Sequence, residues 1–316
     1  MGCSNSKSLN RAEFIKLMRR KNTTEILRKE YYQIRREESN FYGGFDACRR
    51  KENKSKNREE SMLCYEHSRV ILPIEDNAGD YINANYVDGW KQKRKFICTQ
   101  GPLKNTAADF WRLIMMHRTR IIVMLCEASE SDDKVCYRYW NSDKEVKRIG
   151  KFKIQTVDIM SAPHYTVTVL SVSDGTTSSD GTELFHEVIH FAYQKWSNVA
   201  TFQGSIEFTD FILAIRRVHK AFKKDLLENN YSSYKPPIVV HCNCGLCRTA
   251  VFCAMDISIS EYLSNGTISL SQTVINIRKQ RFNCFCCVND YLFYNVLMFT
   301  YITVVSVKKY HKQQSL

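Results

Sequence analysis

The 316-residue sequence has no internal repeat, no secretory signal and no dense set of cysteines. Because its first ten residues are polar, they lack the apolar core of a signal peptide. The 13 cysteines are too sparse for a disulfide-stapled scaffold, and we expect them in a reducing compartment as core thiols, ligands or nucleophiles. An uncharged stretch of 17 residues, 291–307, is at the lower limit for a membrane span, and we predict a buried C-terminal helix there.

What the sequence does contain fits a folded chain of one or two domains. Hydrophobic residues make up 44% and aromatic residues 12%, which excludes a disordered or collagen-like chain. The length suits two domains or one large α/β domain. The net charge of +13 favours an acidic partner, whether nucleic acid, a membrane or a phosphorylated protein. Because the basic run at 49–60 has no interleaved aromatic residues, we expect a solvated loop there and no nucleic acid partner.

The N-terminus carries a lipidation pattern. Gly2 is exposed once Met1 is removed, Ser6 stands where N-myristoylation requires it, and Cys3 is a candidate for palmitoylation. One acyl chain binds a membrane weakly, but a second chain or the basic residues that follow would make the anchoring stable. We therefore predict an acylated basic segment over residues 1–24, and a cytoplasmic protein held on the inner face of a membrane. The alternative is an ordinary tail with an accidental glycine.

Hydrophobic periodicity predicts the order of the main elements. Buried strands are expected at 121–125 and 238–240, and a polar loop at 172–182. Helices are expected at 9–38, 208–227, 249–263 and 269–281, with basic residues opposite the apolar face of 208–227.

The most informative segment joins the strand at 238–240 to the helix at 249–263. It reads His241-Cys242-Asn243-Cys244-Gly245-Leu246-Cys247-Arg248-Thr249. A tight loop that opens a helix presents backbone N–H groups to an anion, and a helix N-terminus with a nearby arginine favours a thiolate. Arg248 can hold two phosphate oxygens, and the Thr249 hydroxyl can reach the sulfur. The loop alone therefore predicts Cys242 as a nucleophile that attacks phosphorus.

With this loop the sequence resembles the non-receptor protein tyrosine phosphatases, whose signature is His-Cys, five residues, Arg, and Ser or Thr. The resemblance extends over roughly residues 25 to 305 through several further motifs. These motifs are Lys56-Asn57-Arg58, Tyr65–Val70, Asp80–Asn85, Thr99–Thr106 with Asp109-Phe110-Trp111, Cys136 with Tyr139-Trp140, and Gln280-Arg281 with Tyr291. Together with the lipidation pattern, they make the chain most similar to the tyrosine-phosphatase-like proteins of parasitoid-wasp bracoviruses.

The resemblance implies an α/β fold, a twisted mixed sheet flanked by helices, in one domain over 25–305 followed by a basic tail over 306–316. It implies a cleft with the signature loop at its base, no cofactor, no metal, and a monomer. The catalytic residues it implies are His241, Cys242, Arg248 and Thr249. The residues it implies for substrate binding are Asn243, Cys244, Gly245, Leu246, Cys247 and Arg248, together with the positions of Glu59, Ser61, Cys286 and Asp290.

Several of these positions depart from the family pattern at the mouth of the cleft. The family's general acid is the Asp of a Trp-Pro-Asp loop, but here Trp196 is followed by Ser197 and Asn198. An amide cannot donate a proton as a carboxylic acid does, which costs about 10²–10⁴-fold in rate. The tyrosine that stacks on the substrate ring is replaced by Glu59, which repels a phosphate dianion, and the acidic residue two positions on is Ser61.

Further departures affect the water-positioning residues and the loop itself. The two family glutamines that position the hydrolytic water are Cys286 and Asp290, and neither offers the paired donor and acceptor of an amide. A loop glycine is replaced by Cys247, whose side chain disturbs the loop if the backbone needs a glycine conformation. The usual Ser and Ala are Asn243 and Cys244, and the usual Gly after Thr249 is Ala250.

Six cysteines gather at this ancestral site. Three lie in the signature loop, and Cys284, Cys286 and Cys287 lie in the segment that faces the loop in the family fold. Tetrahedral zinc, a redox-labile disulfide and neutral drift after catalysis was lost are three alternatives. The spacings do not match a standard zinc knuckle, which argues against a metal.

These departures predict a tyrosine-phosphatase-like protein whose catalysis is lost or strongly impaired. Because the nucleophile and the phosphate-binding arginine remain, the loop would still bind phosphotyrosine or other acidic protein partners in host-cell signalling. One alternative is a weakly active protein-tyrosine phosphatase that forms a phosphocysteine on Cys242. Another is a membrane-anchored scaffold that works through its anchor and the basic helix near Arg216, with Cys242 and Arg248 persisting as relics.

Overall fold

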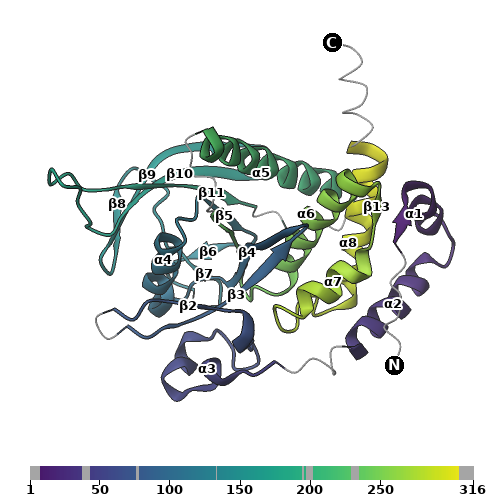
Figure 1. Ribbon diagram of the computed structural model, residues 1–316, viewed down its shortest axis with the longest axis horizontal. Helices are drawn as coiled ribbons and strands as arrows, with labels where there is room; N and C mark the ends of the chain where they lie inside the picture. Colours follow the sequence, from purple (N-terminus) through teal and green to yellow (C-terminus); the bar gives the residue numbers. More distant parts are fainter. Residues whose placement is uncertain are drawn as a thin grey trace, which may run out of the picture.

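A nine-stranded mixed sheet runs through the centre of the molecule, with helices on both of its faces (Figure 1). The computed structural model describes residues 8–37, 43–75, 78–132, 134–193, 196, 202–228 and 235–305. The described strands are β1 Leu9–Asn10, β2 Arg69–Ile71, β3 Tyr81–Gly89, β4 Gln92–Gln100, β5 Ile121–Met124, β6 Ala128–Ser129, β7 Cys136–Tyr137, β8 Val146–Ile149, β9 Phe152–Ser161, β10 Thr166–Ser173, β11 His186–Ala192, β12 Ile238–Cys242 and β13 Thr267–Ile268. The described α-helices are α1 Arg11–Met18, α2 Thr23–Glu37, α3 Asp46–Arg49, α4 Ala107–Met116, α5 Phe202–Glu228, α6 Cys247–Asn265, α7 Leu270–Arg278 and α8 Val288–Thr300. Short 3-10 turns lie at Lys51–Lys56, Glu66–Ser68 and Lys104–Thr106, and a π-helical turn at Tyr301–Val305 continues α8.

The strand order in the large sheet is β2-β3-β4-β12-β5-β11-β10-β9-β8. The four central strands β4, β12, β5 and β11 are parallel, and the strands outside them pair antiparallel. All five residues of β12 are buried, as expected for an apolar strand in the middle of a parallel sheet. The predicted α/β fold with a twisted mixed sheet is therefore confirmed.

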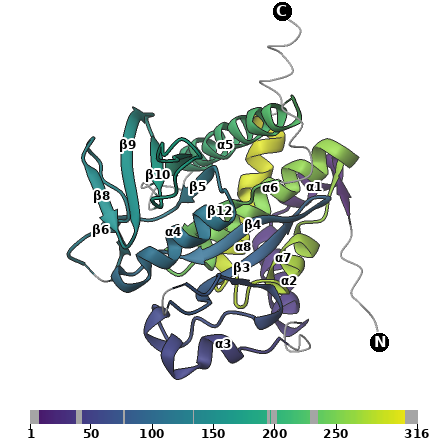
Figure 2. The ribbon, with the colours of Figure 1, turned by 60° about the vertical axis from the view of Figure 1, so that its left-hand side comes forward.

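Helices α4 and α6 cover opposite faces of the sheet (Figure 2). His241 of β12 points toward α4, where its ring centroid lies 5.8 Å from that of Phe110. Residues of the neighbouring strand β4 point the other way, because Phe96 contacts Phe252 of α6 at 6.5 Å between ring centroids. Both faces are therefore buried, and the C-terminal end of β12 is held between them.

Most of the predicted elements are present. The expected helix over 9–38 is divided into α1 and α2, because the Thr23 hydroxyl donates to the carbonyls of Leu17 (2.6 Å) and Arg20 (2.7 Å) and closes a turn between them. The other three helices and both strands lie where expected, with boundaries that differ by several residues. Helix α6 ends at Asn265 because Gly266 follows in a left-handed conformation, with φ +73°.

The structure describes the helix near the C-terminus and part of the N-terminal segment. Residues 291–305 form a buried C-terminal helix, as predicted, and no described helix is long and apolar enough to cross a membrane. Part of the predicted N-terminal segment packs on the domain, since β1 pairs with β13 and Phe14 is buried. Gly2, Cys3 and the tail over 306–316 lie outside the described residues.

The basic residues of α5 are not all on a solvated face. Arg216 donates to the Asp256 carboxylate of α6 at 2.5 Å, and Lys95 of β4 forms an ion pair with the same carboxylate. Burial opposes ionisation of Asp256, but Lys95 and Arg216 outweigh it and lower the pKa of this carboxyl. Arg216 therefore ties α5 to α6, whereas Arg217, Lys220, Lys223 and Lys224 of the same helix are exposed.

Candidate functional site

The signature loop lies at the C-terminal edge of the central parallel strands. Strand β12 ends at Cys242, residues 243–246 form the loop, and α6 begins at Cys247. A strand followed at once by a helix directs the first backbone N–H groups of the helix toward the space above the loop. The predicted strand, loop and helix order is therefore present, and it has the geometry of an anion site.

Gly245 allows the loop to pack closely against β4. Its φ is +68°, and a Cβ atom at this position would lie 2.1 Å from the carbonyl oxygen of Thr99. Directly after β4, the Gly101 N–H donates to the carbonyls of Cys242 (2.6 Å) and Asn243 (3.0 Å). Any larger residue at 245 would have to displace the loop from the strand.

The sulfur of Cys242 accepts two hydrogen bonds within the loop. The Gly245 N–H lies 3.2 Å from it and the Thr249 hydroxyl 3.3 Å from it. Both donors belong to the signature segment quoted above, and the Thr249 contact was predicted from it. These two hydrogen bonds hold the sulfur inside the loop, where a nucleophile that attacks a bound oxyanion would have to lie.

Two arginines that sequence analysis did not single out hold the outer side of the loop. Arg58 donates through Nε to the Asn243 carbonyl at 3.2 Å, and Arg281 donates to the carbonyls of Gly245 (3.3 Å) and Cys244 (3.5 Å). These hydrogen bonds engage the carbonyls of Asn243, Cys244 and Gly245 and thereby fix the backbone of the loop. Arg58 and Arg281 occurred within the quoted motifs, but nothing in their local sequence showed that they contact the loop.

Arg248 rests against the wall of the site. Its Nη1 donates to the carbonyl of Leu125 at 3.1 Å, and its guanidinium carbon lies 5.4 Å from the ring centroid of Trp196. A planar guanidinium in this position can exchange these contacts for two oxygens of a bound phosphate. Trp196 marks the start of the acid loop, whereas Ser197 and the degenerate acid position Asn198 lie outside the described residues.

His241 lies on the opposite side of β12 from the loop interior. Its Nε2 is 2.8 Å from the hydroxyl of Tyr139, and its Nδ1 is 3.9 Å from the sulfur of Cys126. Burial, with a smaller contribution from His190, lowers the pKa of His241 to about 3, so the ring is neutral at physiological pH. It therefore positions the strand that carries Cys242 and does not itself reach a bound anion.

Glu59 and Ser61 form an exposed part of the rim. The Ser61 hydroxyl donates to the Glu59 carboxylate at 3.3 Å. Burial is the main cause that raises the pKa of Cys244 to about 11, with added contributions from Cys242 and Glu59. Glu59 is thus near enough to Cys244 for its charge to affect that thiol. Leu246, the residue before α6, is buried.

Cys247 and Cys286 are joined by a disulfide, with 6.0 Å between their Cα atoms. The other ten described cysteines are free thiols, as expected for a reducing compartment. Among the alternatives for the cysteine cluster, the structure thus contains a disulfide. The other position expected to hold a water-positioning residue, Asp290, has a structural contact. Its carboxylate accepts the Cys287 N–H (3.4 Å) and caps the start of α8.

Two sets of potential metal donors lie near the loop. Donor atoms of Cys247, Cys286 and Asp290 all lie within 4.8 Å of one another, as do those of Cys126, Cys136 and His241. In the first set the two sulfurs are bonded to each other, and a disulfide sulfur is not a thiolate ligand. The second set has three donors from buried side chains. Neither set offers the four donors of a structural zinc site.

Cys284 and Cys287 take no part in the disulfide between Cys247 and Cys286. Cys284 is buried, and burial followed by the nearby Cys98 raises the pKa of its thiol. Cys287 is exposed and precedes the first residue of α8. The six cysteines of the predicted cluster therefore differ widely in surroundings.

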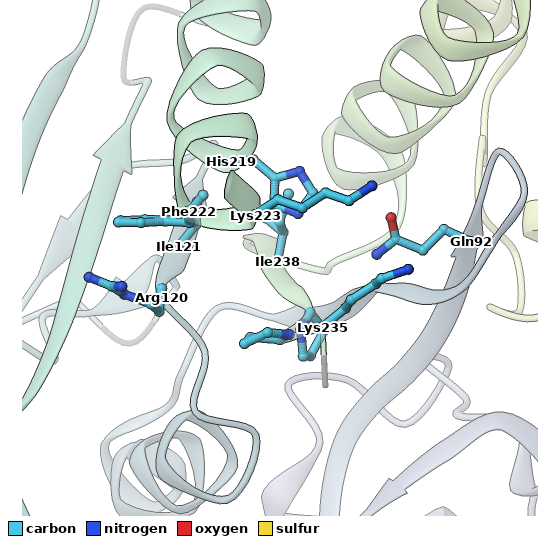
Figure 3. A pocket seen from close by; sticks show the side chains of 10 residues that line it. Gln92, Arg120, Ile121, His219, Phe222, Lys223, Lys235 and Ile238 are labelled. Carbon is cyan, nitrogen blue, oxygen red and sulfur yellow. The ribbon is translucent and has the colours of Figure 1, made fainter. Parts of the chain in front are cut away.

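A separate cavity lies at the other edge of the parallel strands (Figure 3). Ile121 and Ile238, at the starts of β5 and β12, form part of its apolar wall with Phe222 of α5. In Figure 3 the side chains of Lys223 and Lys235 extend toward Gln92, which also lines the cavity. Because the loop follows the far end of β12, this cavity is not part of the signature-loop site.

Comparisons with known proteins agree with the geometry. A sequence profile described as Protein-tyrosine phosphatase matches residues 53–300. The chain is 40% identical over 308 residues to Tyrosine phosphatase H2 of Microplitis demolitor bracovirus, covering 96% of this chain and 92% of that protein. It is 37% identical over 307 residues to Tyrosine phosphatase-like protein J1 of the same virus, covering 96% and 99%. It is 32% identical over 257 residues to the human Tyrosine-protein phosphatase non-receptor type 9, covering 80% of this chain and 42% of that protein.

Proposed function

The chain belongs to the protein-tyrosine phosphatase family, and we propose that it is a member with lost or strongly impaired catalysis that binds phosphorylated or other acidic protein partners in host-cell signalling. The observation that carries the proposal is a contrast within one site. The residues that hold an oxyanion are in place around Cys242, whereas the residues that complete hydrolysis are replaced or used for another purpose.

Binding of an oxyanion is supported by the inner side of the loop. Arg58 and Arg281 hold the loop carbonyls on the outside, and Arg248 stands beside the loop with a guanidinium that can turn onto phosphate. A phosphate held by backbone N–H groups and an arginine fork needs neither a general acid nor a positioned water. Recognition can therefore survive after turnover is lost.

Impaired turnover is supported by the residues at the general-acid position and at the two water-positioning positions. Asn198 cannot protonate a tyrosine leaving oxygen, and Cys286 is bonded to Cys247. Asp290 caps α8, and burial raises the pKa of its carboxyl, which therefore stays protonated to a higher pH than an exposed aspartic acid. No amide remains at either family position to orient the water that would attack a phosphocysteine.

We also propose that acylation at Gly2 and Cys3 holds the protein on the inner face of a membrane as a monomer. The support for this is the sequence pattern together with the basic residues that follow it. Dual acylation would keep the signature loop near membrane-bound signalling partners. Membrane fractionation of the intact chain and of Gly2→Ala tests this, with loss of the variant from the membrane fraction as the expected result.

A second candidate function is a weakly active phosphatase. It is favoured by the hydrogen bonds from Gly245 and Thr249 to the Cys242 sulfur, which are also what catalysis requires. An aryl phosphate with a good leaving group needs little acid assistance and is the sensitive substrate. Substantial turnover that disappears in Cys242→Ser would overturn our preference for a binding protein.

The binding function is tested by recovery of tyrosine-phosphorylated proteins from a cell lysate. We expect the intact chain and Cys242→Ser to recover them, and Arg248→Ala to recover far fewer because it lacks the phosphate fork. Arg248→Lys is the matched variant that keeps the charge and loses the bidentate geometry, and we expect an intermediate recovery. Equal recovery by all four proteins would contradict use of the loop and favour a scaffold role.

A further inference from the structure

The disulfide between Cys247 and Cys286 links the signature loop to the segment before α8. The two residues are 39 apart in the sequence, and the bond connects the start of α6 with the segment that leads into α8. Cys247 directly precedes the phosphate-binding Arg248, and Cys286 occupies one of the water-positioning places. One covalent bond therefore involves both the oxyanion loop and the wall that faces it.

The surroundings of this pair favour reversible oxidation. Cys286 is exposed and Cys247 is partly exposed, so oxidants and reductants in solution can reach the bond. Cys247 is the first residue of α6, and Cys286 lies two residues before α8. Helix N-termini stabilise thiolates, and the thiolate is the form that attacks an oxidant.

Other close thiols in the described structure lack this access. The sulfurs of Cys98 and Cys253 are 3.6 Å apart, but both residues are buried and remain free. Cys126 and Cys136 are also buried, and the hydrogen bond between them, followed by burial, raises the pKa of the Cys126 thiol. Proximity alone therefore does not distinguish the bonded pair, whereas solvent access does.

We propose that Cys247 and Cys286 are a redox modification site whose oxidant is a hydroperoxide, and that the disulfide restricts the oxyanion loop. One thiolate attacks the peroxide oxygen, breaks the O–O bond and becomes a sulfenic acid, while the departing oxygen leaves as water or an alcohol. The second thiolate then attacks the sulfenic sulfur, forms the S–S bond and releases water. The two thiols lose two electrons and two protons in total, and a small thiol reverses the reaction by exchange.

The effect on the loop rests on the proposed function. In the disulfide form, Arg248 donates to the Leu125 carbonyl and lies against Trp196. To grip an oxyanion, the guanidinium must leave that carbonyl, but the bond at the preceding residue restrains the backbone from which it turns. Reduction should therefore raise oxyanion affinity, within the range of about 5- to 150-fold that is typical of coupled sites.

The bond itself is tested by thiol labelling and mass spectrometry of the full chain before and after hydrogen peroxide. We expect peroxide to remove two labelled thiols and to link the peptide of Cys247 to that of Cys286, and dithiothreitol to restore both. Cys286→Ser should abolish the link. Cys287→Ser is the matched control, because it removes the adjacent exposed thiol and should leave the link intact.

Two results would overturn this assignment. In the first, peroxide modifies Cys242 while Cys247 and Cys286 remain labelled. In the second, the reduced protein holds one equivalent of zinc and forms no link in peroxide, which would make Cys247, Cys286 and Asp290 part of a metal site.

The effect on the loop is tested by tungstate binding, because tungstate is a phosphate analogue that dithiothreitol leaves unchanged. We expect tighter binding to the reduced than to the oxidised protein, and no response to peroxide in Cys247→Gly. Equal affinity of a chain whose bond forms and breaks would overturn the loop effect and leave the modification site standing. Absence of tungstate binding in both states would instead overturn the proposed function, and the loop effect with it.

Discussion

Two parts of the site differ in how far they match the family pattern. The base is the signature loop around Cys242, and the rim is formed by Glu59, Cys286 and Asp290. At the base, Cys242 receives hydrogen bonds from Gly245 and Thr249, and the loop is held by Arg58 and Arg281. At the rim, a carboxylate stands in place of the stacking tyrosine, and the two water-positioning places are occupied by a disulfide and a helix cap. The site thus combines a loop that matches the family signature with surrounding positions that depart from the family pattern.

This difference separates two tasks that an active phosphatase performs together. In such an enzyme the base binds phosphate through an arginine and the backbone N–H groups of a loop, and here that loop packs closely against β4 at Gly245. The rim supplies proton transfer and water positioning, which depend on side chains that can change without disturbing the core. Loss of the rim should therefore reduce turnover far more than it reduces binding.

The largest expected effect comes from repair of the rim. Asn198→Asp combined with Cys286→Gln restores an acid and one water-positioning amide and removes the disulfide. We expect turnover of a phosphotyrosine peptide to rise by about 10²–10⁴-fold, with a much smaller gain for an activated aryl phosphate that needs no acid. Steady-state phosphate release measures both.

Asn22→Asp is the matched control for this repair, because it adds the same carboxylate in an exposed turn between α1 and α2. We expect no change in turnover from it. A repaired rim without any gain on the phosphotyrosine peptide would mean that the base, and not the rim, limits catalysis.

The next effect is on stability, and it concerns the buried ion pairs of Asp256 on α6, the helix that follows the signature loop. Asp256 pairs with Lys95 and Arg216 and is only 4% exposed at its side chain. Asp256→Asn leaves two cations without their buried partner, and we expect the free energy of unfolding to fall by about 3–5 kcal/mol at pH 7. Urea unfolding measures this, and Glu187→Gln, which breaks an exposed pair with Arg120, should cost only about 0–1 kcal/mol.

The same ion pair predicts a direction of pH dependence. Because the folded pKa of Asp256 lies below its ordinary value of 3.8, its contribution is fully present above that value. The contribution is lost as the pH falls through the lowered folded pKa. The difference in unfolding free energy between the intact chain and Asp256→Asn should therefore shrink only in acid, and a difference that vanishes near neutral pH would contradict the assignment.

A somewhat smaller effect tests the fit of the loop against β4. Gly245→Ala places a Cβ against the Thr99 carbonyl at a positive φ, so we expect about 2–4 kcal/mol of destabilisation together with weaker tungstate binding. Gly175→Ala is a matched control, because Gly175 also has a positive φ, +86°, but has open space around its Cβ position. It should cost about 1–2 kcal/mol and leave binding unchanged. Equal effects of the two substitutions on binding would show that the loop tolerates displacement.

The smallest expected effect belongs to the charge at the rim. Glu59→Gln removes a carboxylate near the loop and should strengthen tungstate binding by up to about fivefold, an effect that decreases as salt is added. Glu60→Gln is the control, since Glu60 lies next in the sequence and pairs loosely with Lys54 at 3.9 Å. A similar gain in both variants would point to overall charge and not to the position of Glu59.

The sequence was sufficient for the parts of the molecule that are determined locally. The buried β-branched strand before Cys242, the glycine within the loop and the helix after Arg248 follow each other directly, so their order predicts the anion site. The turn between α1 and α2 was missed, although Thr23 could have signalled it as a residue that closes turns through its hydroxyl.

The parts that escaped prediction depend on contacts between distant segments. Arg58 is 185 residues from Asn243, and Cys247 is 39 residues from Cys286, so no local pattern shows that they meet. The basic residues of α5 were placed opposite its apolar face, but Arg216 turns inward because Asp256 lies buried on α6. A single sequence does not reveal which charge of a basic stripe has a buried partner.

The central statement is that the base binds phosphate although the rim cannot complete its hydrolysis. The most direct measurement compares the dissociation constants of one tyrosine-containing peptide with and without phosphate, for the reduced intact chain and for Arg248→Ala, while phosphate release is followed in the same samples. We predict a clear preference of the intact chain for the phosphorylated peptide, loss of that preference in Arg248→Ala, and little phosphate released. Equal binding of both peptides by the intact chain, or rapid release of phosphate, would contradict this account.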